Sequence, residues 1–462
     1  METKLKTTTD SDPERDSTNA PKQSSWLASA FGGPNVVIGP RIEPVAAHLL
    51  PNHQEGDSDV GSAAEIMGKQ VDAEQGNGIN LLGLVPGLIL TAVVASLVLY
   101  TSLVLWEFCL RHPEVRDVCD VGQMIFWNKK WAWWWTAIMF ALNNTFIQAL
   151  HVLVGGIYLN TMTEADTIHA CRTVAFAVAV TVISWLGSLP RTFNMLSTLG
   201  FAPAGYPELG EPIVSAWTPS TTTLVTGMSA FMNMSYTFIG QTTLPSFIAE
   251  MRDPRDFPKA LWACTCAEIV TFSIVGSVIY AYTGNQYMVA PAFGVLENVY
   301  KKVSYSFMIP TIIFVGCLYA SVTGRFIFFR MFHQSKHLTE HTFKGWFYWG
   351  LVLLGSWVLS FIIAEVIPFF SSLLSVMSSL FNCWFGFIFW GLAYFRMRNA
   401  DIKHGVPRRK ILDKLSVALN VVIILTGFLY LTLGTYVSVQ GIIDQFEAGT
   451  VGGVFSCKSN GL

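Results

Sequence analysis

One apolar stretch of this 462-residue sequence, residues 222–249, contains residue types that break a membrane helix and bind ions or charged solutes. Gly240 and Pro245 interrupt it among polar neighbours, and a break leaves backbone N–H and C=O groups free for a ligand. We expect the break near Gly240. The candidate lining residues are Asn233, Tyr236, Thr237, Gly240 and Gln241. The alternative is a Gly and Ser packing face, with Asn and Gln bonded to neighbouring helices.

Charged residues in and beside the apolar stretches give further candidates. Glu268 and Glu365 are carboxylates inside such stretches, where a charge is costly and therefore suggests function. Glu365 lies near the end of its stretch and can reach the interface, so Glu268 is our candidate for proton coupling. Glu250 and Arg252 belong to a charged cluster that directly follows the broken stretch. We interpret these two as gating or structural residues, without substrate contact.

The composition places these residues in a membrane protein. Hydrophobic residues make up 52% of the chain, charged residues 13%, and the mean hydropathy is +0.45, whereas a soluble domain carries about 25% charged residues. Nine runs are long enough to cross a bilayer as helices, and their lack of alternation excludes a β-barrel. The fold class is therefore an all-α polytopic membrane protein. The runs cover residues 82–106, 131–160, 173–189, 222–249, 261–282, 304–324, 345–364, 371–395 and 415–439.

The Lys and Arg residues in the short loops set the orientation, because positive charge stays on the cytoplasmic side. Basic clusters follow the first, fourth, sixth and eighth runs. The third and fourth runs then both pass from outside to inside, ending at Arg191 and Arg252, which successive crossings cannot do. Residues 191–220 are too short and too rich in proline to supply the missing crossing. The same argument puts residues 1–80 outside the cell without an export signal, so a crossing is missing there too.

Four motifs occur in a fixed order. They are GLVPGLIL at 83–90, LRHPEVRDVCDVGQ at 110–123, LPRTFNMLSTLG at 189–200 and FIGQTTLPSFIAEMRDPRDFPKAL at 238–261. Together they resemble the fungal members of the amino acid/auxin permease family, over roughly residues 81–440. The resemblance implies eleven helices in a LeuT-like inverted repeat, helices one to five against six to ten, and proton-coupled uptake of amino acids.

The chain departs from the pattern of that family at two places. GNGINLLGLVPG at 76–87 begins where helix one should end, and STLGFAPAGYPELG at 197–210 joins the loops that flank helix five. Both places coincide with the missing crossings required by the charges. We therefore predict nine spans, without equivalents of helices one and five. The predicted domains are a disordered acidic tail at 1–80, a transporter domain at 81–440 and a C-terminal tail at 441–462.

The resemblance makes the break a substrate site. An amino acid brings a carboxylate and an ammonium that must lose water near the midplane, and the ends of two half-helices can replace that water. The expected function is secondary uptake of neutral aliphatic and aromatic amino acids by alternating access. The alternatives are a transport-deficient sensor or binding protein, or a faulty gene model of an intact permease. An enzyme is disfavoured because no paired catalytic carboxylates or nucleophile constellation appears in the spans, and the sequence has no P-loop or nucleophile elbow.

The expected partners follow from this function. They are an amino acid substrate, protons as the coupling ion and the lipid bilayer; no cofactor, metal or nucleic acid is expected. We expect the plasma membrane rather than the vacuolar membrane.

Overall fold

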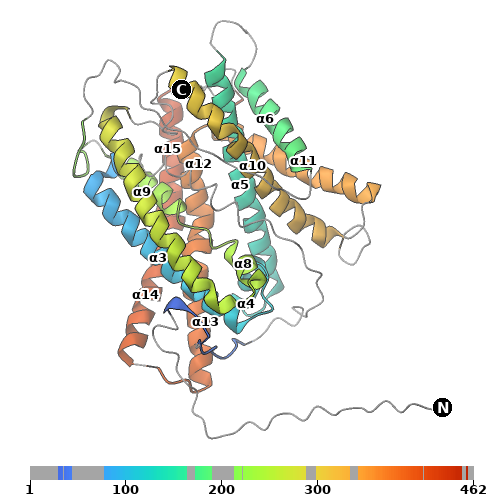
Figure 1. Cartoon of the computed structure of the whole chain (residues 1–462), viewed down its shortest axis with the longest axis vertical. Coiled ribbons are helices and arrows are strands. Elements are labelled where there is room, and N and C mark those ends of the chain that lie inside the picture. Colours follow the sequence, from blue (N-terminus) through green and yellow to red (C-terminus); the bar gives the residue numbers. More distant parts are fainter. Residues whose placement is uncertain are drawn as a thin grey trace, which may run out of the picture.

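Long helices dominate the computed structural model of the chain (Figure 1). The structure describes residues 30–34, 36–43, 78–163, 172–189, 213–220, 222–287, 298–332, 342–408, 410–449 and 454–455. Within these residues, 7 helices are long and apolar enough to cross a membrane. They are α3 (Leu84–Arg111), α5 (Lys130–Met162), α9 (Phe257–Tyr287), α10 (Asn298–Met331), α11 (Phe343–Val366), the continuous α12 (Phe370–Met377), η3 (Ser378–Ile388) and α13 (Phe389–Lys403), and the continuous α14 (Lys410–Leu429), η4 (Tyr430–Gly434) and α15 (Thr435–Glu447).

Shorter helices complete the described chain. They are α4 (Val118–Ile125), α6 (Arg172–Ser188), α7 (Leu224–Tyr236), α8 (Leu244–Glu250) and the 3-10 turn η1 (Pro254–Asp256). Each of the nine predicted runs therefore coincides with helix, and two of them differ in form. The third run gives α6, whose 17 residues extend about 26 Å, and the fourth run is divided into α7 and α8. The last helix continues to Glu447, beyond the predicted boundary at residue 440.

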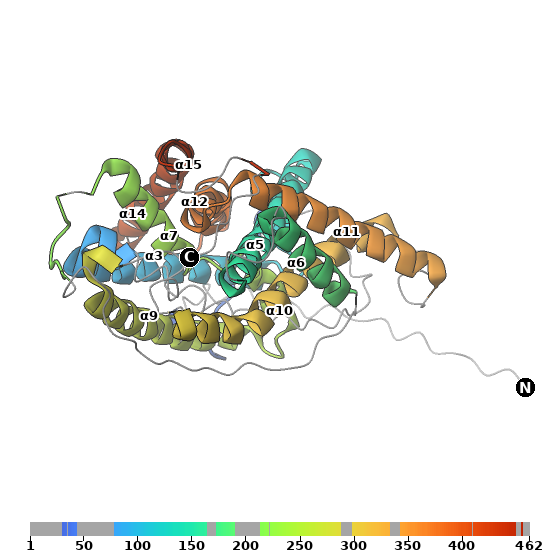
Figure 2. The same cartoon turned by 90° about the horizontal axis from the view of Figure 1, so that it is seen from above.

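The helices form groups around α5 and α3. Seen from above (Figure 2), α5 stands beside α6, α10 and α11, and these helices pack on one another. On the other side α3 packs against α9 and α13, while α7 packs against α12 and α15. Few residues of α9 are covered: only 17% of its apolar window is buried, compared with 72% for α5. The outer face of α9 is consequently open to its surroundings.

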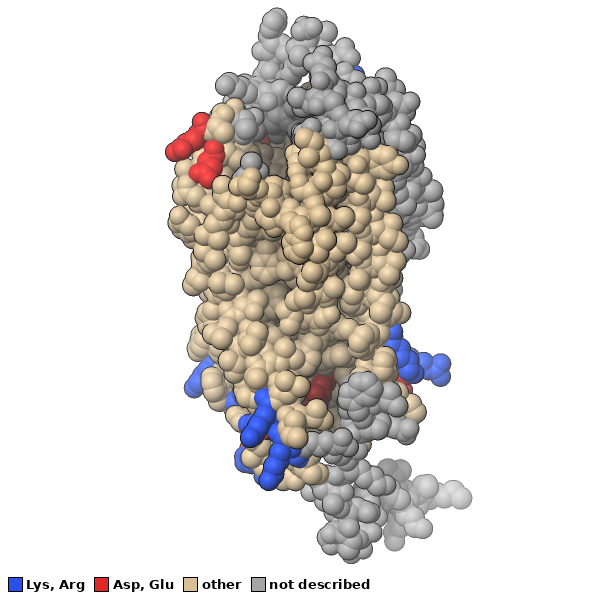
Figure 3. Space-filling model, turned by 90° about the vertical axis from the view of Figure 1, so that its left-hand side faces the viewer, with Lys and Arg blue, Asp and Glu red and all other residues tan. Residues whose placement is uncertain are grey.

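Charge is distributed as a bilayer requires. Figure 3 shows a broad uncharged band, with Lys and Arg gathered below it and acidic residues at its upper edge. The C-terminal ends of α3 and α13 and the N-terminal ends of α9 and α11 carry Arg111, Lys403, Lys259 and Lys344. Because positive charge is retained on the cytoplasmic side, this end of the bundle is the cytoplasmic end.

The described residues on either side of 44–77 and of 190–212 lie at opposite ends of the bundle. Glu43 contacts α13 at the cytoplasmic end, whereas Leu81 accepts a hydrogen bond of 2.7 Å from Thr222 just before α7, at the other end. The carbonyl of Leu189 accepts from Trp349 near the cytoplasmic start of α11, and that of Ile213 accepts from Asn285 at the outer end of α9. Glu43 and Leu189 therefore lie at the cytoplasmic end, and Leu81 and Ile213 at the outer end.

Part of the predicted disordered tail lies against the bundle. Residues 30–34 and 36–43 cross the cytoplasmic ends of α9, α3 and α13, which differs from the expectation for residues 1–80. Trp262 donates to the carbonyl of Ala30 over 2.9 Å and stacks on Phe31, and Ile42 is only 1% exposed. Burial of Ile42 and the stacking of Phe31 on Trp262 offset the entropy of ordering the segment. The rest of the tail before residue 78 is outside the described residues, and its disorder stays a prediction.

Candidate functional site

The predicted break is present between α7 and α8. The capping box of Thr223 with Thr226 starts α7, which ends at Tyr236, and α8 begins at Leu244. Pro245 explains why no continuous helix forms, since it has no N–H for the carbonyl four residues earlier and its ring would clash with that carbonyl. Thr237 also bonds its hydroxyl to the carbonyl of Met234 over 2.7 Å, which satisfies one group at the end of α7. The interruption therefore follows directly from the residue types.

The break leaves three successive N–H groups available for a ligand. The backbone N–H of Phe238, Ile239 and Thr243 each donate to a nearby carbonyl, but those of Gly240, Gln241 and Thr242 have no acceptor in the described part of the chain. Successive N–H groups in a turn make a partly positive concavity that suits an anion. Gly240 is exposed, and no atom lies within 4 Å of the position a Cβ would take there. The turn therefore faces open space.

Gln241 fixes the position of the break relative to α3. Its side chain is 0% exposed, and its amide nitrogen donates to the Thr101 hydroxyl over 3.0 Å. Its carbonyl oxygen is buried and has no partner in the described chain. Thr101 is ten residues before the cytoplasmic end of α3, which corresponds to about 15 Å of helix. The break thus lies well inside the apolar thickness of the protein.

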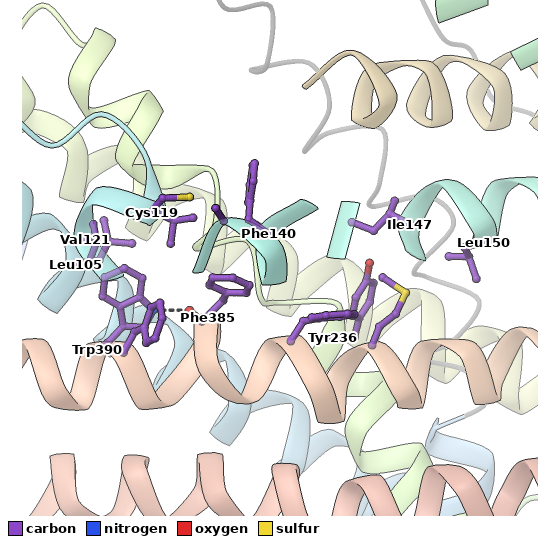
Figure 4. Packing of buried hydrophobic residues seen from close by; sticks show 14 of the residues in the cluster. Leu105, Cys119, Val121, Phe140, Ile147, Leu150, Tyr236, Phe385 and Trp390 are labelled. Carbon is purple, nitrogen blue, oxygen red and sulfur yellow. Dashed lines mark hydrogen bonds between the residues drawn. The ribbon is translucent and has the colours of Figure 1, made fainter. Parts of the chain in front are cut away.

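Asn233 is bonded to a neighbouring helix. Its amide nitrogen donates to the Ser371 hydroxyl over 2.6 Å, and its carbonyl accepts from the Ser375 hydroxyl over 2.9 Å. This arrangement matches the packing alternative for Asn233, in which it joins α7 to α12. Tyr236 is 6% exposed and belongs to the main apolar cluster, which Figure 4 shows extending from Trp390 and Phe385 to Ile147. Thr237, Gly240 and Gln241 remain as the residues at the turn itself.

Glu268 approaches the break from α9. It is partly exposed and accepts a hydrogen bond of 3.4 Å from the thiol of Cys264. One helical turn further along α9, Phe272 packs edge-on against Phe238 of the break, with 5.3 Å between ring centroids. Glu268 therefore lies about one turn from the contact between α9 and the broken segment. The described residues contain no group of three His, Cys, Asp or Glu side chains that could hold a metal ion.

The predicted gating pair is only partly described. Arg252 is exposed, and the side chain of Glu250 is outside the described residues, so their pairing remains a prediction. A different cluster, which the sequence did not indicate, ties the cytoplasmic ends of α3 and α13 together. Arg111 donates to both carboxylate oxygens of Asp401 over 2.6 and 3.2 Å, and these side chains are 3% and 5% exposed.

Arg408 extends this cluster. It pairs with Asp401 and, over 3.0 Å, with Asp413, which also accepts from Arg398 over 2.7 Å. Burial lowers the pKa of Arg408, but its hydrogen bonds to Asp401 and Asp413 outweigh burial and raise it overall. The guanidinium therefore stays charged. Arg111 and Asp401 are 290 positions apart, so only the fold brings them together.

The fold and the site define a class of protein: an all-helical, multi-pass membrane transporter with a discontinuous span. The chain belongs to the transmembrane amino acid transporter protein family, whose model matches residues 76–206 and 209–440. Because this is a family of transporters, the chain is not an enzyme. The family also implies an amino acid as the substrate.

Three curated relatives align over most of the chain. The N amino acid transport system protein of Neurospora crassa is 29% identical over 396 residues, covering 81% of this chain and 82% of the relative. Transmembrane transporters of Gibberella moniliformis and Fusarium pseudograminearum are each 28% identical over 407 and 411 residues, covering 83% of this chain and 82% of each relative.

Proposed function

We propose that this protein takes up neutral aliphatic and aromatic amino acids together with protons, by alternating access around the break at Gly240. The observation that carries the proposal is the set of free N–H groups at residues 240–242, held inside the apolar thickness of a member of an amino acid transporter family. A substrate carboxylate bound there would exchange its water for three fixed donors. Carbonyl groups at the C-terminal end of α7 would bind the ammonium.

The substrate class rests on the relatives and on the surroundings of the break. The relative named for N amino acid transport aligns with four-fifths of this chain. Phe238, Phe272 and Tyr236 surround the break with aromatic surface, which favours an uncharged side chain on the substrate because a charged one would lack a partner there. Integral membrane location follows from the family, and we propose the plasma membrane as the site of uptake.

The architecture we propose is a LeuT-like inverted repeat without the equivalents of helices one and five. The described residues that flank 44–77, and those that flank 190–212, lie at opposite ends of the bundle, and neither stretch contains an apolar run long enough for a helical span. The family match begins at residue 76 and is interrupted at 207–208, next to the same two places. The open face of α9 is the surface that a further helix would cover. The absence of the two helices also favours the second candidate, a sensor that binds an amino acid without transporting it.

Uptake by proteoliposomes tests the site. Gly240→Leu puts a bulky side chain into the space before the free N–H groups, so we expect saturable uptake of labelled leucine or phenylalanine to be lost. The protein should still fold, because no atom lies within 4 Å of the new Cβ. Gly355→Leu is the matched control: Gly355 is exposed on α11, also with nothing within 4 Å of a Cβ, and uptake should be unchanged.

The outcomes separate the two candidates. Uptake that survives Gly240→Leu would show that the site lies elsewhere. Amino acid binding to the purified wild type without uptake, when Gly240→Leu abolishes the binding, would favour the sensor over the transporter.

Proton coupling is tested at Glu268. Glu268→Gln removes a proton-accepting carboxylate one turn from the contact of α9 with the break. We expect the uptake driven by an inward proton gradient to fall to the rate measured without a gradient. Glu365→Gln, which removes a carboxylate near the end of α11, should keep the dependence on the gradient. If Glu365→Gln abolishes this dependence and Glu268→Gln does not, the assignment of the coupling residue is wrong.

A further inference from the structure

A cavity opens at the cytoplasmic end of the bundle, between residues 41–43 and the last turns of α13. Its volume is about 570 Å³, and Arg41, Arg396, Lys403 and His404 line it together with one carboxylate, Glu43. The cavity therefore combines three cations with a single anion. This cluster is separate from the break, which lies deeper in the protein.

Two of the three cations in the cavity have a carboxylate partner. Arg41 pairs with Glu114, and Lys403 pairs with Glu43. Lys403 and Glu43 are 65% and 60% exposed, and such an exposed pair contributes little because water screens it. Glu114, the partner of Arg41, is only 12% exposed. A ligand that offers a stronger anion can therefore replace Glu43 at small cost.

Arg396 is the cation without an acidic partner in the described chain. Its guanidinium donates to two backbone carbonyls, that of Glu43 over 2.8 Å and that of Met124 over 3.4 Å. Its Nε is buried and has no acceptor. A buried donor on a charged group is costly to leave unpaired, and a guanidinium suits the paired oxygens of a phosphate. Arg396 thus points to an anionic ligand with several oxygens.

The surroundings of Arg396 place the cavity at the depth of the lipid headgroups. Its guanidinium carbon lies 5.1 Å from the ring centre of Trp127. Trp127 is 60% exposed, and Trp131 and Trp134 at the start of α5 are 60% and 62% exposed. Exposed Trp rings at the end of a span are typical of the interface between headgroups and hydrocarbon. The cytoplasmic leaflet at this end is the one that carries anionic lipids.

We propose that this cavity binds the phosphate-bearing headgroup of an anionic phospholipid of the cytoplasmic leaflet, with Arg396 and Lys403 as its main contacts. The bound phosphate accepts from the guanidinium of Arg396 and from the ammonium of Lys403, which then releases Glu43. Arg41 closes the opposite wall. Because Arg41 belongs to the tail segment and Arg396 to α13, the lipid joins these two parts of the molecule.

The test uses the full-length protein, purified in detergent and titrated with phosphatidylinositol 4-phosphate, phosphatidylcholine or inorganic phosphate, with bound molecules counted by native mass spectrometry. We expect the phosphoinositide to bind with clear preference over phosphatidylcholine. Arg396→Gln and Lys403→Gln should each weaken that binding about tenfold, the loss expected for one charge-assisted contact. Lys344→Gln, which removes an exposed cation outside the cavity at the start of α11, should leave it unchanged.

Three results would overturn the proposal. These are equal binding of phosphatidylcholine and the phosphoinositide, equal loss in Lys344→Gln, and binding of inorganic phosphate as tightly as the lipid, which would assign the cavity to free phosphate. Arg396→Gln also removes hydrogen bonds to two carbonyls and can impair folding. Lys403 is exposed and makes no such bonds to the backbone, so Lys403→Gln keeps the test decisive.

Discussion

At the scale of single residues, His112 connects the tail segment to α3. It is 0% exposed; its Nε2 accepts the N–H of Ile42 over 3.2 Å, and its Nδ1 lies 3.3 Å from a carboxylate oxygen of Glu114. Burial lowers the pKa of His112 to about 4, although Glu114 opposes this shift. The ring is therefore neutral in the folded protein near neutral pH. Protonation would turn its acceptor into a donor that faces the N–H of Ile42.

This residue predicts a pH dependence of stability. The folded pKa lies below the unfolded value of 6.5, so the folded state loses stability as pH falls from about 6.5 to about 4, by up to about 3 kcal/mol. Asp120 has the opposite effect on stability. Burial, together with nearby Asp117, raises the pKa of Asp120 to about 7. The stability that its protonated form gives the folded state is therefore lost as pH rises from about 4 to 7. The His112 effect must be measured as a difference between variants.

Thermal unfolding of purified protein between pH 4 and 7.5 provides that difference. His112→Gln should flatten the fall in melting temperature on the acid side, and His404→Gln, which removes an exposed imidazole at the end of α13, should not. Identical profiles for wild type and His112→Gln would contradict the assignment.

At the scale of elements, the pair of Arg111 with Asp401 holds α3 against α13. Both side chains are buried, and Asp401 also pairs with Arg408. Asp401→Asn would remove the buried carboxylate that Arg111 and Arg408 share, leaving Arg111 paired with Glu107 and Arg408 with Asp413. Breaking a buried pair costs about 3–5 kcal/mol. Asp256→Asn breaks an exposed pair with Lys259, 46% and 58% exposed, and should cost less than about 1 kcal/mol. Melting temperatures of the two variants measure the contrast; equal losses would mean that the buried pair does not hold the helices together.

The sequence predicts the helices and the break, but not the contacts between helices. The spans follow from local residue types, because a long apolar run must be helical in a bilayer. The break follows from Pro245 together with the polar residues around Gly240, since proline alone does not interrupt a span: Pro310 lies inside the continuous α10. The pair of Arg111 with Asp401, the acceptor Thr101 for Gln241 and the bonds of Asn233 to α12 depend on which helices become neighbours. No local sequence pattern encodes which helices become neighbours. The burial of Ile42 was missed because the apolar run around it is short and lies in a polar tail.

At the scale of the whole molecule, residues 36–43 and the end of α15 should lie on opposite sides of the membrane. Arg41 contacts the cytoplasmic ends of α3 and α13, whereas Thr218 bonds the carbonyl of Leu82 before α3, and α15 ends at Glu447 at the outer end. Glu43 and Leu81 therefore lie on opposite sides of the membrane, and residues 44–77 between them contain no apolar run long enough for a helical span.

Labelling of single cysteines in intact cells tests this arrangement directly. Arg41→Cys, Thr218→Cys and Glu447→Cys, each in a background with all eight native cysteines changed to Ser, are treated with a membrane-impermeant maleimide. We expect Thr218→Cys and Glu447→Cys to react in intact cells and Arg41→Cys to react only after permeabilisation. If Arg41→Cys reacts in intact cells, the tail lies outside and residues 44–77 need not cross. The contacts of residues 36–43 with Arg111 and α13 would then be absent in the membrane, and Arg41 and Glu43 would not line the lipid cavity.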